Sequence, residues 1–245
     1  MYHLELPTAL SPVVHVDEAA RGDRIVSSKR YKLLQAVVLF CAGLFALGCG
    51  AAGSEPAEET SSTAQATHAL VAPWRETDIG AVGLAGDSAN SNGQIAVYGS
   101  GADIWGSADA FHYLYQRLNG NTQVVARVDS VVNTNAWAKA GIMIRDTLDA
   151  GSRHAFVCLT PSNGVAFQSR DTTGGSSVNA NVTGIVAPYW VKLARSGDQF
   201  SAYRSADGVT WTQIGTTRTI DMPPVVYVGL AATSHDNARL GSASF

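Results

Sequence analysis

The sequence predicts an all-β fold, an antiparallel two-sheet jelly-roll sandwich of about a dozen strands. Beyond Trp74 the apolar residues recur with a period near two, and clusters of Gly, Asn, Asp and Ser break the pattern at short intervals. No segment there shows a convincing helical period. Because so many strands rarely form one open twisted sheet, two packed sheets are the favoured arrangement.

The individual strands follow from the same pattern. We expect them at residues 94–99, 109–118, 123–131, 138–145, 154–159, 165–170, 189–195, 200–204, 210–214 and 225–232, with a last short strand near Ala243. Tight hairpins are expected at Asn119-Gly120-Asn121, Ser196-Gly197-Asp198 and Ala206-Asp207-Gly208. Gly and Asn accept the positive φ that such turns need.

The N-terminal region has the pattern of a secretory signal. A basic stretch at residues 29–32 precedes an uncharged apolar run at 33–48 and then Cys49. The segment Phe45-Ala46-Leu47-Gly48-Cys49 resembles a bacterial lipobox, which implies lipidation of Cys49 as the new N-terminus. We therefore interpret residues 1–48 as a leader and lipoprotein signal peptide. The alternatives for residues 33–48 are a buried core helix and an uncleaved membrane anchor.

Residues 49–73 are expected to form a disordered tether, because Ala, Ser, Thr, Gly, Glu and Pro cannot bury enough apolar surface to fold. One acyl chain gives only marginal membrane binding, so stable anchoring needs the several chains that a lipoprotein N-terminus would carry. Gly50 rather than Asp follows the cysteine, and the resemblance to sorted lipoproteins then favours the outer membrane of a bacterial cell envelope.

Length, charge and cysteine content limit what the expected folded domain can be. Residues 74–245 have the length of a single β-sandwich domain. From Cys49 onward the chain has 12 Lys and Arg against 16 Asp and Glu, and this balance lacks the basic patch of a nucleic-acid-binding protein. Cys158 is the one cysteine in the expected domain, so no disulfide framework is expected within it, and we predict an inert buried thiol.

Several motifs carry a resemblance to a known superfamily. They are Gly99-Ser100-Gly101-Ala102-Asp103-Ile104-Trp105-Gly106, Asp109-Ala110-Phe111-His112-Tyr113, Trp137-Ala138-Lys139-Ala140-Gly141-Ile142-Met143-Ile144-Arg145, Ala187-Pro188-Tyr189-Trp190-Val191-Lys192-Leu193 and Asp207-Gly208-Val209-Thr210-Trp211. From Trp74 to Phe245 the chain resembles secreted bacterial domains, largely of unknown function, in the concanavalin A-like lectin/glucanase superfamily. This resemblance implies a concanavalin A-like sandwich and an association with carbohydrate.

The sequence disfavours an enzyme. A glycoside hydrolase needs two flanking carboxylates, typically closely spaced glutamates in this superfamily, and no glutamate follows Glu76. The aspartates fall mostly at turns and strand starts, where local hydrogen bonding explains them. No cofactor is expected, although Asp87, Asn90, Asn92 and Asp103 offer the oxygen ligands that calcium prefers; turn stabilisation is the favoured interpretation.

A candidate ligand-binding face follows from strand alternation. If the aliphatic residues of the central strands point inward, their polar partners share the opposite face. That face would present Arg145, His154, Gln168 and Arg170, together with His112 and Gln116 or alternatively Tyr113 and Tyr115. Trp137 lies on an expected loop that could present a stacking platform, whereas Trp105, Trp190 and Trp211 are expected in the core.

These observations predict a membrane-anchored extracytoplasmic lipoprotein, secreted across the inner membrane, with a non-catalytic carbohydrate-binding module. Its expected partners are a polysaccharide or glycan and, through the lipid, the membrane; we expect a monomer. The alternative is a structural or protein-interaction β-sandwich of the cell envelope, and a glycoside hydrolase is a disfavoured third.

Overall fold

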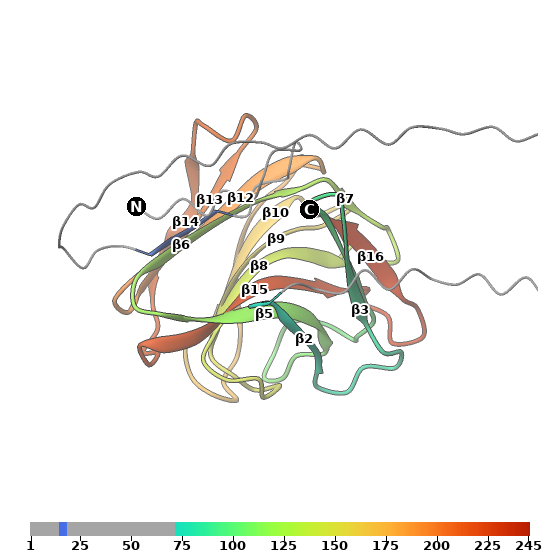
Figure 1. Ribbon diagram of the computed structural model, residues 1–245, viewed down its shortest axis with the longest axis horizontal. Helices are drawn as coiled ribbons and strands as arrows, with labels where there is room; N and C mark the ends of the chain where they lie inside the picture. The colour runs from blue at the N-terminus through green and yellow to red at the C-terminus, as the bar shows by residue number, and fades with distance from the viewer. Residues whose placement is uncertain (1–14, 19–71) are drawn as a thin grey trace, which may run out of the picture. The chain divides into compact units, whose positions relative to one another are not determined.

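The computed structural model describes residues 15–18, which form one strand, and residues 72–245 (Figure 1). These residues belong to one compact unit, and every strand pair in it is antiparallel. The predicted all-β fold is therefore confirmed. No helix long and apolar enough to cross a membrane occurs in the described ranges.

The strands form three sheets. In spatial order, the five-stranded sheet contains β1 (His15–Glu18), β6 (Thr122–Val128), β12 (Tyr189–Ser196), β13 (Gln199–Ser205) and β14 (Thr212–Thr219). The seven-stranded sheet contains β11 (Val178–Val182), β10 (Val165–Arg170), β9 (His154–Leu159), β8 (Lys139–Arg145), β15 (Val225–Thr233), β5 (Phe111–Asn119) and β2 (Arg75–Ile79). The four-stranded sheet contains β3 (Asp87–Ser91), β4 (Gln94–Gly99), β16 (Gly241–Ser244) and β7 (Ser130–Val131).

The main core lies between the five- and seven-stranded sheets. Ile142 and Ile144 of β8 meet Val191 and Leu193 of β12 in one buried cluster. The intervening residues of β8, Met143 among them, point to the other side of the seven-stranded sheet. We call that side the outer face.

The predicted strands match the observed ones closely, and the three predicted hairpins are present: Gly120, Gly197 and Gly208 all have positive φ. The expectation missed β2, β3 and β11. Their exposed or polar residues give no clear apolar alternation, since these strands lie at sheet edges. β1, which pairs with β6, falls in the segment predicted as leader. The remaining leader, Cys49 and nearly all of the predicted tether lie outside the described residues.

Candidate functional site

The outer face of the seven-stranded sheet is covered by the β4–β5 loop, residues 100–110. Ile104 of this loop is buried in a second apolar cluster with side chains of the outer face, including Tyr113, Met143 and Phe156. The backbone nitrogen of Asp109 donates to the carbonyl of Ala150 in the β8–β9 loop at 2.9 Å. Loops therefore close over the face, and its centre is not an open groove.

Asp109 fastens this loop to the sheet. Arg170 of β10 donates two hydrogen bonds to its carboxylate, at 2.7 and 2.9 Å. Arg145 and His154 stand across the carboxylate at 3.6 Å each, as neighbours of Arg170 in register on β8 and β9. All four side chains are buried. We call Asp109, Arg145, His154 and Arg170 the Asp109 cluster.

Backbone carbonyls satisfy most of the remaining donors of the two arginines. Arg170 also donates to the carbonyls of Trp105, Gly106, Ala150, Ser152 and Gly175. Arg145 donates to the carbonyls of Thr147 and Asp149. Because guanidinium groups have several fixed donors, each arginine ties two or more chain segments together. The cluster thus holds the covering loops in place.

Burial also sets the charge of the cluster. It lowers the pKa of His154 to about 4, an effect that Asp109 opposes and the two arginines reinforce. Neither ring nitrogen of His154 has a hydrogen-bond partner among the described residues. Burial also lowers the pKa of Arg145. His154 is therefore neutral near pH 7, where Asp109 faces two arginines.

The other predicted site residues divide between the two faces. Of the two pairs considered for this face, Tyr113 and Tyr115 lie on it. Both are buried, and their rings stack with centroids 5.3 Å apart. Gln168 is buried on the same face. His112 and Gln116 alternate with Tyr113 and Tyr115 and so point the other way.

His112 has its own carboxylate partners. It contacts Asp78 at 2.8 Å and Glu76 at 3.2 Å, both on β2. Asp78 in turn accepts from the backbone nitrogen of Gly86. This group ties β2 to β5 and to the loop that follows β2.

An accessible group lies where the β4–β5 loop meets the start of β8. Asp103 of this loop pairs with Lys139 of β8 and, at 3.2 Å, with His235 of the β15–β16 loop. Lys139 also donates to the carbonyl of Ile104, and its ammonium lies 5.9 Å from the ring centroid of Trp137. Trp105 follows Ile104. We call Asp103, Trp105, Trp137, Lys139 and His235 the Asp103 site.

Three members of the Asp103 site reach solvent, unlike the side chains of the Asp109 cluster, while Lys139 is buried. The exposed fractions are 25% for Asp103, 29% for His235 and 39% for Trp105. His235 has φ of 56°, a left-handed conformation that is uncommon for residues other than glycine. Non-glycine residues held in this region cluster at functional sites.

Three tryptophans differ from expectation. Trp105, Trp190 and Trp211 were expected in the core, but none is buried. Ile104 takes the inward position in the β4–β5 loop and leaves Trp105 outward. Trp190 alternates with buried Val191 on β12, and Trp211 precedes β14. Trp137 lies on the β7–β8 loop, as predicted, and is half-buried.

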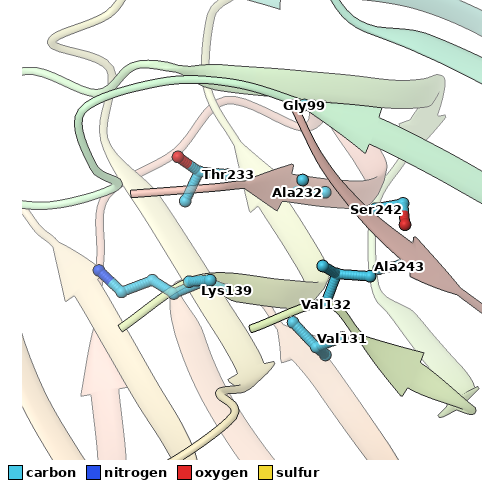
Figure 2. A pocket seen from close by; sticks show the side chains of 10 residues that line it. Gly99, Val131, Val132, Lys139, Ala232, Thr233, Ser242 and Ala243 are labelled. Atoms are coloured by element: carbon cyan, nitrogen blue, oxygen red, sulfur yellow. The ribbon is translucent and has the colours of Figure 1, made fainter. Parts of the chain in front are cut away.

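A small cavity lies beside the Asp103 site (Figure 2). Its volume is about 10 Å³, and its lining includes Val131, Val132, Lys139 and Ala243. In Figure 2 the ammonium of Lys139 points away from Val131, Val132 and Ala243. A space of this size holds about one water molecule. The cavity itself is therefore too small for a sugar ring.

The residues considered for calcium do not share one loop. Asp87, Asn90 and Asn92 belong to the β3–β4 hairpin, where Asn90 accepts from the backbone nitrogen of Gly93 at 3.1 Å. Asp103 lies on the next loop and is paired with two basic side chains. Within residues 72–245, no group of three or more His, Cys, Asp or Glu residues is placed to hold a metal.

Sequence analysis did not identify Lys139 and His235 as site residues. Lys139 belongs to the segment 137–145 that carries the superfamily resemblance. Its position two and four residues before Gly141 and Met143 predicts that it lies on the same face of the strand as they do. His235 gave no such signal, because the β15–β16 loop has no periodic pattern. Only the fold brings this loop beside Asp103.

Comparison with known proteins shows likeness of fold. No protein-family model matches the chain, and no curated protein matches it. A functionally unknown protein from Saccharomyces cerevisiae is similar in structure, with a TM-score of 0.51 and 18% identity over 64% of this chain and 86% of that one.

Two further structural likenesses have TM-scores below 0.5. The GH43 protein BlXynB from Bacillus licheniformis, as its K247S mutant, gives a TM-score of 0.48 at 14% identity, over 63% of this chain and 32% of its own. Lectin I-B4 from Griffonia simplicifolia gives 0.44 at 8% identity, over 76% and 93%. The described chain is an antiparallel β-sandwich, and these likenesses extend to the fold alone.

Proposed function

We propose that this protein is a carbohydrate-binding lipoprotein of the bacterial cell envelope, and that the Asp103 site makes the contact. The observation that carries the proposal is the solvent-facing Asp103–His235 pair, with the half-buried Trp137 beside Lys139 and the exposed Trp105 two residues after Asp103 on the same loop. Indole rings stack on the apolar faces of sugars, while carboxylate and imidazole groups exchange hydrogen bonds with hydroxyls. The module is proposed to be non-catalytic.

The site is preorganised for such contact. Lys139 is almost fully buried and holds Asp103 through one oxygen, which leaves the oxygen paired with His235 at the surface. A carboxylate held in this way needs little reordering on binding, which reduces the entropic cost of association.

The test of sugar binding is a glycan array followed by calorimetry on the full chain in detergent. Trp105→Ala and Trp137→Ala should each weaken binding of any glycan hit by about tenfold or more, as loss of a stacking ring at the centre of a site does. Tyr98→Ala removes an aromatic residue with 36% exposure on β4 and serves as the control. Unchanged binding in both tryptophan variants would refute the site; a chain that binds no glycan but captures an envelope protein would favour the structural alternative.

The proposed anchor rests on the lipobox-like segment at Cys49. Cys49→Ala should abolish incorporation of labelled fatty acid and remove the protein from the outer-membrane fraction. Cys41→Ala, which alters the other cysteine of the N-terminal region, is the matched control. Lipid labelling that survives the change at Cys49 would overturn this part of the proposal.

A further inference from the structure

The solvent-facing side of the five-stranded sheet has a second group of aromatic and basic side chains. Trp190 and Lys192 alternate with buried Val191 and Leu193 on β12 and therefore point outward. Tyr203 of β13 stands directly opposite Lys192, and Trp211 lies just before β14. We call Trp190, Lys192, Tyr203 and Trp211 the Lys192 surface.

Two aromatic rings flank the ammonium of Lys192. Its nitrogen lies 4.6 Å from the ring centroid of Tyr203 and 4.4 Å from that of Trp211. These are cation–π distances. Gly208 of the β13–β14 hairpin packs against the indole ring of Trp190, so closely that a Cβ at this position would lie 2.9 Å from the ring. The rings thus form a positioned surface around one cation.

Lys192 has no acidic partner within residues 72–245. The ion pairs of this part of the chain include none to Lys192. Of the other basic residues in β6, β12, β13 and β14, Arg127 pairs with Asp129 at 3.0 Å, and Arg195, Arg204 and Arg218 alternate to the opposite face of the sheet. Among these four strands, Lys192 is therefore the one basic residue on this face without an ion pair to residues 72–245.

The geometry points to a second binding site on the Lys192 surface, for an acidic polysaccharide whose sugars carry carboxylates. A sugar ring can stack on Trp211 or Tyr203 while its carboxylate reaches the ammonium between them. Gln213 and Thr217 of β14, which are exposed and hydrogen-bonded to each other at 3.2 Å, add hydroxyl and amide groups beside the rings. This site is separate from the Asp103 site, which lies at the seven-stranded sheet.

Desolvation of Lys192 supports the assignment. Burial lowers the pKa of its ammonium, which means that contacts in the free protein do not fully replace the water that the charged form has lost. A bound carboxylate would supply that compensation. Attraction of this kind between partly exposed charges weakens with added salt.

The test compares polygalacturonate with its fully methyl-esterified form, which keeps the sugar rings and removes the charge. Calorimetry on the full chain in detergent should show binding of the acidic polymer and weakening of about tenfold or more with the esterified one. Lys192→Met keeps the apolar stem between the rings and should reduce binding to the same degree, and Trp211→Ala should reduce it as well. Arg218→Met, on β14 of the same sheet, is the matched control and should bind normally.

A second measurement uses the wild-type protein, so that its result does not depend on whether a variant folds. In the wild-type protein, bound polygalacturonate should protect Lys192 from reductive methylation, as read by peptide mass spectrometry. Equal binding of both polymers, normal binding by Lys192→Met, or unprotected Lys192 would overturn the inference. Loss of binding in Trp105→Ala but not in Lys192→Met would place the polymer at the Asp103 site, so failure here is distinguishable from failure of the proposed function.

Discussion

Two aspartates of one loop are used in opposite ways. Asp109 is buried and pairs with Arg170, also buried, while Asp103 is partly exposed and pairs with Lys139 and His235. Both carboxylates attach the β4–β5 loop to basic side chains. The two ion pairs differ in their access to water. The charges of a buried pair must be compensated by groups of the protein, whereas an exposed pair can exchange its partners for water or a ligand. The Asp109 cluster is thus structural, and the Asp103 site is available for recognition.

The largest expected effect is at Arg170. Arg170→Met leaves Asp109 buried without its two closest hydrogen bonds, so the free energy of unfolding should fall by about 3–5 kcal/mol. Urea denaturation followed by tryptophan fluorescence measures it. Arg239→Met, at an exposed pair with Asp236, should change stability by less than about 1 kcal/mol. A loss of similar size in both variants would contradict the contrast between the two regions.

The next effect is a pH dependence that comes from His154. Its pKa of about 4 in the folded protein lies below the ordinary value of 6.5, so the unfolded chain binds the extra proton first as pH falls. The contribution to stability is complete above pH 6.5 and is lost progressively between pH 6.5 and pH 4, by up to about 3 kcal/mol.

His154→Phe separates this effect from other titrating groups. The variant cannot be protonated, and neither ring nitrogen of His154 has a partner to lose among the described residues. Unfolding free energies measured from pH 4 to pH 7 should therefore fall less steeply than in the wild type. Parallel curves for wild type and His154→Phe would disprove the assignment.

How much the sequence could predict also differs between the two regions. Alternation placed Arg145, His154 and Arg170 together on one face, because the period of a strand is a property of the chain itself. Their burial was not predictable in the same way. It depends on Ile104 and the covering loops, whose position comes from contacts between segments far apart in sequence.

The same reasoning applies to the tryptophans and to His235. A large aromatic residue in an apolar stretch favours the core, yet Trp190 is turned outward by its place in β12 beside Val191. His235 joins Asp103 only because the β15–β16 loop returns to the β4–β5 loop. Contact of ligand with the predicted outer-face residues stays a prediction, and it would require the covering loops to move.

Lys139 should have an intermediate effect, since it is buried but its partner is not. Lys139→Met removes a bond to Asp103 and one to the carbonyl of Ile104, while Asp103 can turn to water. We expect a loss of about 1–3 kcal/mol in unfolding free energy, together with weaker glycan binding. Lys139→Arg should recover part of the stability. A variant as unstable as Arg170→Met would show that the Asp103 site is part of the structural core.

The smallest expected effect on stability is at Trp105, and it gives the sharpest separation of the two regions. Trp105→Ala removes a ring that is 39% exposed, whereas the hydrogen bond that Arg170 donates to this residue uses its backbone carbonyl and is retained. The free energy of unfolding should change by less than about 1 kcal/mol, as surface substitutions usually do. Glycan binding should nevertheless fall. Denaturation and binding measured on the same preparation decide the matter: a large loss of stability with unchanged binding would move Trp105 from the recognition surface to the scaffold.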